Sequence, residues 1–193
     1  MSGWTEDRDR PRAWEVLESR EVFAAEPWIR LSVQKVRLPD GRVIDDYHQV
    51  DFPDYAVVFA QTRSGEVVVE RLYKHGVGRE CLALPSGLLE PGEEPIDAAR
   101  RELLEETGYA SDDWSTLGSF VMNGNYGCGK AHLFMARNAF KVAQPDSGDL
   151  EEIQVDTIAQ DALMDAVRSG EVVLIGSAAA ISLAVNALTA GAK

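Results

Sequence analysis

The chain has 193 residues, of which 45% are hydrophobic, and this is enough for one substantial core with a small appended module. Its net charge of −13 argues against a nucleic-acid backbone or an anionic membrane surface as the main partner. We therefore expect no nucleic-acid partner and no membrane partner. A small anionic substrate remains compatible, because a bound metal ion can invert the field within a pocket.

The first part of the chain predicts a small antiparallel β module. Residues 1–11 are polar and charged, show no signal-peptide pattern and are expected to be flexible. The sequence Pro39-Asp40-Gly41 predicts a hairpin, since Asp-Gly favours the positive φ angles of a tight turn. We assign residues 12–50 to this module and residues 51–193 to a second domain. The expected strands of the N-terminal module lie at 20–23, 28–37 and 42–50.

The second domain mixes strands and helices without a regular βαβ alternation. Strands are expected at 55–61, 66–73, 82–85, 117–122, 131–137 and 152–157, and helices at 159–168 and 177–188. The apolar segment 175–190 is shorter than the roughly 20 residues of a membrane span and is expected to pack as a helix. The expected fold class is α/β, with a mixed sheet between helices and an N-terminal antiparallel module.

A further helix, ending before Gly108, has its acidic residues at the unfavourable end. Glu105 and Glu106 fall in its last turn, where the helix dipole disfavours each by about 0.3–1 kcal/mol. Glu102 and Glu106 are also a like-charged pair four residues apart. At about 100° per residue the three carboxylates share one side of the helix. Hard divalent cations take such oxygen ligands, so the pattern favours a metal site over a solvated acidic surface. The apolar residues expected on the opposite side are Ile96, Leu103 and Leu104.

The segment 87–109 resembles the signature of the Nudix hydrolases, G-x5-E-x7-R-E-U-x-E-E-x-G-U, in which U is a bulky aliphatic residue. Only Tyr109 departs, as an aromatic residue at the last position. The fixed positions match by chance with a probability on the order of 10⁻⁸ per start site. The matching residues are Gly87, Glu93, Arg101, Glu102, Leu103, Glu105, Glu106 and Gly108.

The resemblance to the Nudix hydrolases implies a metal centre. It implies that Mg²⁺, with Mn²⁺ as the alternative, is bound by Ser86 through its backbone carbonyl, Glu102, Glu105 and Glu106. Glu93 and Arg101 would support these ligands, Arg101 through its planar fork of donors.

The flanking segments 69–74 and 84–93 resemble the ADP-ribose and nucleoside-diphosphate-sugar pyrophosphatase branch. This resemblance implies a homodimer and a catalytic carboxylate in a late acidic loop, which we assign to Glu151, with Asp149 and Glu152 as competitors. Ala83 departs from the branch, which often has glutamate there. The 123–130 loop lacks an acidic residue, and 47–49 lacks an arginine. The expected catalytic residues are Glu105, Glu106, Glu151 and Asp149. The expected substrate contacts are Trp28, Arg71, Lys74, Gly87, Asn125 and Tyr126.

The segment 124–130 fits G-x4-G-K, the opening of a P-loop. Ala131 replaces the expected Ser or Thr, and a strand follows instead of a helix, which argues against a P-loop nucleotidase. We interpret it as a hairpin loop lining a substrate pocket, with a solvated turn as the alternative. Trp28 is the candidate for purine stacking, and an ordinary core or interface aromatic is its alternative. Cys81 and Cys128 match no C-x-x-C pattern and are expected to be free thiols in the cytoplasm.

The expected function is Mg²⁺-dependent hydrolysis of the pyrophosphate bond of a nucleoside diphosphate sugar. ADP-ribose, cleaved to AMP and ribose 5-phosphate, is the favoured substrate. GDP-mannose, UDP-glucose and dinucleoside polyphosphates are the alternatives. A non-catalytic sensor of nucleotide sugars is a rival interpretation, but such regulators usually carry a DNA-binding module and this chain has no basic patch.

Overall fold

The computed structural model describes residues 13–146, 148, 150 and 152–191. The segment 1–11, Asp149 and Glu151, for which the sequence gives predictions, lie outside the described residues. The chain divides into two compact units. The first comprises the residues up to Pro53 together with Asn123–Gly129, and the second comprises Asp54–Met122 and Lys130–Lys193.

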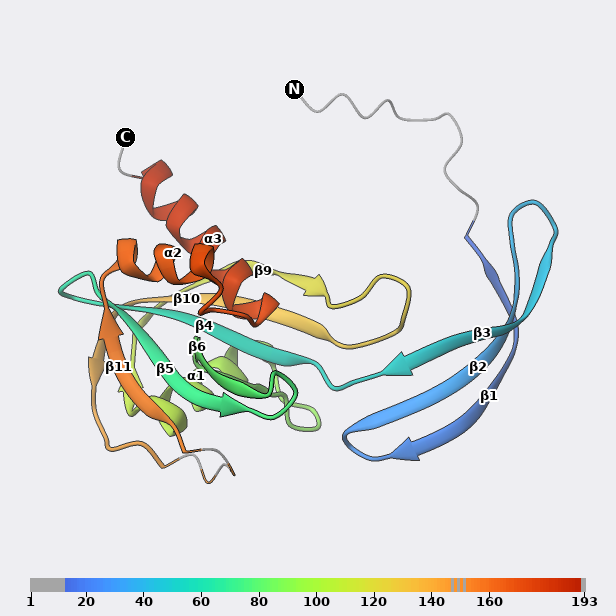
Figure 1. The fold of residues 1–193 in the computed structure, drawn as a ribbon, viewed down its shortest axis with the longest axis horizontal. Helices are drawn as coiled ribbons and strands as arrows, with labels where there is room; N and C mark the ends of the chain where they lie inside the picture. Colours follow the sequence, from blue (N-terminus) through green and yellow to red (C-terminus); the bar gives the residue numbers. More distant parts are fainter. Residues whose placement is uncertain (1–12, 147, 149, 151, 192–193) are drawn as a thin grey trace. The chain divides into compact units, whose positions relative to one another are not determined.

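The first unit is built on a three-stranded antiparallel sheet in the order β1-β2-β3 (Figure 1). Its strands are β1 (Glu15–Ala25), β2 (Ile29–Arg37) and β3 (Val43–Asp51). The hairpin between β2 and β3 is confirmed, since Gly41 has φ +89° and its N–H donates to the Leu38 oxygen at 2.9 Å. The 123–129 loop belongs to this unit because the Tyr47 hydroxyl donates to the Asn125 backbone oxygen at 2.8 Å.

The second unit is a mixed sheet with helices on both faces, so the expected fold class is confirmed. The main path of the sheet runs β11-β5-β4-β10-β8, with β6 paired to β5, β7 to β4 and β9 to β10. Only β4 and β10 run parallel among these pairs in the described part of the chain. The strands are β4 (Tyr55–Thr62), β5 (Val67–Lys74), β6 (Arg79–Ala83), β7 (Ser86–Leu88), β8 (Tyr109–Ala110), β9 (Asp113–Val121), β10 (Lys130–Lys141) and β11 (Gln154–Ile158).

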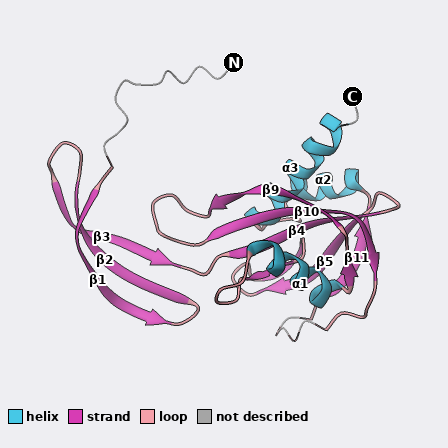
Figure 2. Cartoon of the chain, turned by 180° about the vertical axis from the view of Figure 1, so that it is seen from behind, coloured by secondary structure: helices cyan, strands magenta, loops and turns pink. Residues whose placement is uncertain are grey.

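Helix α1 (Pro95–Thr107) covers one face of this sheet, and α2 (Gln160–Ser169) and α3 (Ile175–Gly191) cover the other (Figures 1 and 2). Successive side chains of the central strand β4 point to opposite faces of the sheet, so this strand contributes to the core layers on both faces. Val57 and Phe59 pack with α2 and α3, whereas Ala56 and Val58 pack with α1. Small side chains, Ala56 of β4 and Ala98 and Ala99 of α1, let the helix approach the sheet closely.

The expectation that Leu104 shares the buried face of α1 is wrong. Leu103 is fully buried, but Leu104 is 41% exposed. Successive helical residues point about 100° apart, and α1 packs against only one sheet, so the adjacent leucine turns toward solvent.

Asp54 joins the starts of β4 and β10. Its carboxylate accepts hydrogen bonds from the Lys130 N–H at 2.8 Å and from His132 Nε2 at 3.1 Å, and its backbone oxygen accepts the Leu89 N–H at 3.0 Å. Burial alone would raise the pKa of Asp54, but the hydrogen bonds to its carboxylate and the nearby positive charges outweigh it and lower the pKa. The stabilisation is therefore present above the unfolded pKa of about 3.9 and is lost as the pH falls through the lower folded value.

We expect Asp54→Asn to lower the melting temperature by about 2–4 °C at pH 6, because a partly exposed hydrogen bond to a charged group contributes about 1 kcal/mol. The difference from the wild type should shrink as the pH falls through the lowered folded pKa of Asp54, because the carboxylate is then protonated in both states. Thermal melts from pH 3 to 7 measure this. Asp165→Asn, in an exposed pair with Arg168, is the matched control. A pH-independent difference would contradict the assignment.

Candidate metal and catalytic site

The loop between β7 and α1, which ends at Pro95, returns the chain so that α1 packs against β7. Gly92 adopts φ +81° in the turn after Pro91, and Pro95 is the first residue of the helix, where its missing N–H has no cost. Gly108 ends the helix with φ +72°, and its N–H donates to the Leu104 oxygen at 2.8 Å. The helix thus begins and ends at the residues that the sequence indicates.

Gly87 leaves the space that the Glu102 carboxylate occupies. It pairs with Ala56 of β4, so a side chain at this position would point toward α1. A Cβ atom there would lie 2.0 Å from Glu102 Oε1, closer than any real contact. A buried carboxylate of the helix therefore lies close against the backbone at Gly87.

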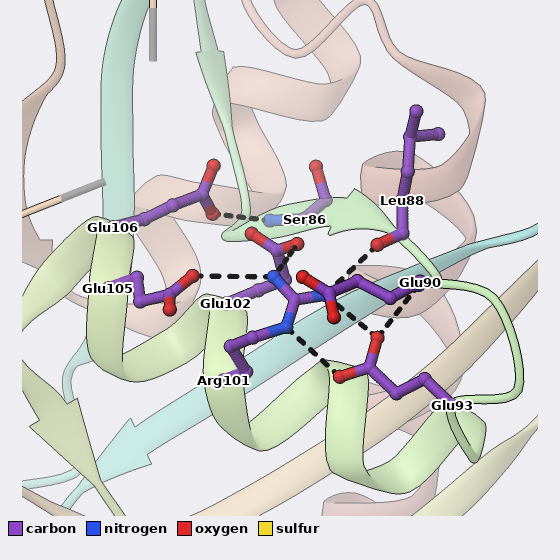
Figure 3. A network of polar contacts seen from close by, with 8 residues as sticks. All are labelled: Ser86, Leu88, Glu90, Glu93, Arg101, Glu102, Glu105 and Glu106. Carbon is purple, nitrogen blue, oxygen red and sulfur yellow. Dashed lines mark hydrogen bonds and ion pairs between the residues drawn. The ribbon is translucent and has the colours of Figure 1, made fainter. Parts of the chain in front are cut away.

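The backbone of Ser86 contacts a second carboxylate. The Ser86 N–H donates to Glu106 Oε2 at 2.7 Å, and Glu106 is only 4% exposed. Figure 3 shows this contact beside the side chains of Glu102 and Glu105. Two of the three predicted metal ligands on the helix therefore lie against β7, Glu102 at Gly87 and Glu106 at Ser86. The Ser86 backbone is itself a predicted ligand.

Arg101, in the middle of α1, supplies positive charge to the glutamate cluster. Its guanidinium donates to Glu93 at 3.0 and 2.9 Å, to Glu102 at 2.6 Å and to Glu105 at 3.3 Å, and also to the Leu88 backbone oxygen at 3.0 Å (Figure 3). The hydrogen bond to Glu93 is the main reason that the pKa of Arg101 is raised, and the same bond lowers the pKa of Glu93. These contacts are the kind that a supporting role requires.

The donor set fits a hard divalent cation by its chemistry. Three carboxylates, those of Glu93, Glu102 and Glu105, contact one guanidinium. With Glu106 bonded to the Ser86 amide beside them, the four carboxylates carry an excess of negative charge for a cation to neutralise. Within the described ranges, no three acidic, histidine or cysteine side chains converge as a preformed metal site. The ion pairs with Arg101 explain this for Glu102 and Glu105, because they direct both carboxylates toward the guanidinium.

The predicted substrate residues are distributed over both units. Trp28, in the turn between β1 and β2, and Tyr126, in the 123–129 loop, are exposed in the first unit. Lys74 ends β5 in the second unit. Arg71, also in β5, is in an exposed ion pair, with its guanidinium 2.5 Å from the Glu171 carboxylate after α2.

Of the predicted late-loop carboxylates, only Glu152 falls within the described residues, where it is exposed before β11. Asp149 and Glu151 lie outside the described residues, so their assignment stays a prediction.

Glu70 in β5 is a buried carboxylate that the sequence did not predict, with only 1% of its surface exposed. It stands opposite Ala83 of β6 and Val155 of β11 in the sheet register, and Val155 packs in the α1 layer of the core. Ala83 is the position where the branch that the flanking segments resemble often has glutamate. In this chain a buried carboxylate, Glu70, lies on the adjacent strand. An acidic residue interrupting the apolar run Val67–Leu72 was the available signal.

Comparison with known proteins matches most of the chain. A family model described as NUDIX domain matches residues 52–172, and one described as Nucleoside diphosphate sugar hydrolase N-terminal domain matches residues 14–50. The chain is 29% identical over 181 residues to an ADP-ribose pyrophosphatase of Mycobacterium tuberculosis (strain ATCC 25618 / H37Rv), covering 92% of this chain and 83% of the relative.

The chain is also 29% identical over 150 residues to a methanol dehydrogenase activator of Bacillus methanolicus, covering 75% of this chain and 80% of the relative. A crystal structure of an ADP compounds hydrolase superposes with a TM-score of 0.82 at 18% identity, covering 95% of this chain and 98% of that one. At this identity the match shows a shared fold.

Proposed function

The chain belongs to the Nudix family, and from this premise we propose that it is a pyrophosphohydrolase acting on a nucleoside diphosphate sugar, with ADP-ribose giving AMP and ribose 5-phosphate. The observation that carries the proposal is the placement of Glu102 in the space left by Gly87 and of Glu106 on the Ser86 amide. The names of the relatives, ADP-ribose pyrophosphatase among them, support the substrate class.

We propose that the Ser86 carbonyl and the carboxylates of Glu102, Glu105 and Glu106 hold Mg²⁺, with Mn²⁺ as the alternative. When bound, the metal supplies charge neutralisation at the diphosphate and lowers the pKa of a water molecule. Arg101, anchored by Glu93, orients the carboxylates around this position.

The other roles are proposals for the chain's own side chains. A carboxylate of the 149–152 segment takes the proton of the attacking water, and we assign this role to Glu151 ahead of Asp149 and Glu152. A Glu151→Gln variant with an unchanged rate would transfer the role to one of the other two. Lys74 and Arg71 neutralise substrate phosphates. Trp28, Asn125 and Tyr126 contact the nucleoside, with Trp28 stacking on the purine.

A panel of diphosphate substrates tests the proposed activity. ADP-ribose, GDP-mannose, UDP-glucose and a dinucleoside polyphosphate are incubated with the protein, and the products are identified by chromatography. We expect hydrolysis of ADP-ribose to AMP, its loss on chelation and its recovery on adding Mg²⁺. Binding of ADP-ribose without turnover under any metal would establish the sensor interpretation instead.

We also propose a cytoplasmic homodimer in which the N-terminal modules are exchanged between subunits. Both cysteines, Cys81 and Cys128, are free and buried, which agrees with a reducing compartment. No helix in the described part of the chain is long and apolar enough to cross a membrane. Light scattering that gives the mass of a single chain would contradict the dimer.

A further inference from the structure

An apolar cavity of about 370 Å³ opens on the face of the sheet opposite α1, between β4, the end of β9 and the start of α3. Met122, the residue after β9, lines this cavity and also a neighbouring one of about 60 Å³. Ser86, whose amide bonds the Glu106 carboxylate, lines the larger cavity as well. A chemical change at the Met122 side chain therefore falls where the two cavities meet and beside the strand that carries Ser86.

Met122 is the methionine that a dissolved oxidant reaches most easily among those that the structure describes. Met122 is 40% exposed, whereas Met135 is 1% exposed and Met164 packs partly buried against the core. Oxidation converts the flexible apolar side chain of methionine into a polar, chiral sulfoxide, and it requires access of the oxidant to the sulfur. The three residues therefore form a series of decreasing access, with Met122 at its open end.

The Tyr55 hydroxyl is a full hydrogen-bond donor that is matched with a weak acceptor. It donates to Met122 Sδ at 3.0 Å, and a thioether sulfur accepts hydrogen bonds poorly. Burial raises the pKa of Tyr55, so the hydroxyl keeps its proton. The start of α3 limits the room for this hydroxyl to turn away, since a Cβ atom at Gly176 would lie 2.7 Å from it. An oxygen atom added to the sulfur would give the hydroxyl an acceptor of ordinary strength.

Met122 has the freedom to present such an oxygen to the hydroxyl. The backbone of Tyr55 is held between Leu88 of β7 and Ala131 of β10, whereas Met122 follows the last residue of β9. Methionine is unbranched and has three rotatable bonds, so its exposed side chain can withdraw by the roughly 1 Å that an inserted oxygen requires. The tyrosine can then stay in place while the sulfoxide oxygen turns toward it.

We infer that Met122 is a site of oxidation by hydrogen peroxide, at which Tyr55 sets the configuration of the sulfoxide and binds its oxygen. The sulfur gives two electrons and forms a bond to one peroxide oxygen, and the O–O bond breaks. The proton of the transferred oxygen passes to the leaving hydroxide, which departs as water. The sulfur has two lone pairs, and the hydrogen bond from Tyr55 engages one of them. Oxygen therefore adds to the other, which forms one sulfoxide epimer in excess.

The product carries a polar S–O group at the junction of the two cavities, beside the strand of the candidate metal site. Peroxide thereby changes the polarity of a surface that Ser86 also lines. Neither the oxidation nor its configuration depends on the proposed hydrolysis, so both are measured without substrate or metal.

Peroxide treatment followed by mass spectrometry of peptides tests the site. We expect Met122 to gain one oxygen atom at least about tenfold faster than Met135, with Met164 between them. In denaturant the three rates should converge, because the difference comes from the folded structure. A Met122 rate no higher than that of Met135 in the folded protein would overturn the inference.

The epimer ratio separates the role of Tyr55 from simple exposure. Peptides of the oxidised protein are treated with one of the two epimer-specific methionine sulfoxide reductases, with dithiothreitol as the thiol reductant. We expect one enzyme to repair at least about three times as much Met122 sulfoxide as the other, and the ratio to fall toward one in Tyr55→Phe. Phenylalanine keeps the ring, so this variant should fold. Equal repair in the wild type, or the same ratio in both proteins, would overturn the inference.

Thermal melts test the bond between Tyr55 and the sulfoxide oxygen. The oxidised wild type should melt within about 2 °C of its reduced form, whereas oxidised Tyr55→Phe should melt about 2–4 °C below its own reduced form. Oxidation of the other methionines is common to both proteins and cancels in this comparison. An equal loss in the two proteins would overturn the assignment of Tyr55 as the donor.

Discussion

Glu106→Gln is expected to reduce kcat/KM on ADP-ribose by about 10²–10³-fold while leaving the fold intact. Glutamine keeps the size of the side chain, and its Oε1 can still accept the Ser86 N–H, which Glu106 now accepts at 2.7 Å. The negative charge that would hold a divalent cation is removed. Initial rates over a Mg²⁺ titration, together with a thermal melt, measure the effect. A loss that raised Mg²⁺ partly restores would point to metal affinity as the cause.

Glu105→Gln should act in the same direction, because Glu105 carries the third carboxylate of the set and shares Arg101 with Glu102. Glu94→Gln is the control, since Glu94 is an exposed glutamate at the start of the same helix and makes no side-chain cap hydrogen bond. Its turnover should stay within about twofold of the wild type. Near-normal turnover in both Glu105→Gln and Glu106→Gln would remove the basis for the metal assignment.

Gly87→Ala is expected to have the second largest effect, a loss of about 10²-fold in kcat/KM with a destabilisation of about 1–3 kcal/mol. The new methyl group would lie 2.0 Å from Glu102 Oε1, so the carboxylate must move. Glu102 is bonded to Arg101 at 2.6 Å, so the displacement also disturbs the guanidinium that holds Glu93 and Glu105. Kinetics and chemical denaturation measure the two effects.

Gly76→Ala is the matched control for this substitution. Gly76 lies in the turn after β5 and has no positive φ, and a methyl group added there would meet no atom of the described residues within 4 Å. Its turnover and stability should change little. If Gly87→Ala behaved like Gly76→Ala, the close packing of Glu102 on the loop would have no catalytic consequence.

Short-range signals account for the elements that the sequence predicted well. Pro95 and Gly108 bound α1 because a missing N–H and a left-handed residue act within one turn of the chain. Asp40-Gly41 similarly fixes the hairpin between β2 and β3. The short strands β7 and β8 were not predicted, because three and two residues show no periodicity and pair only with distant strands.

The sequence by itself determined the family motif, the mixed fold, the bounds of α1 and the acidic composition of its last turn. Each of these depends on residue identity and on spacing along one segment. Only the tertiary structure placed Glu70 opposite Ala83, brought the Ser86 amide to Glu106, and exposed Leu104. These features depend on the register between strands and on which face a helix packs, and that is decided by contacts between segments far apart in the chain.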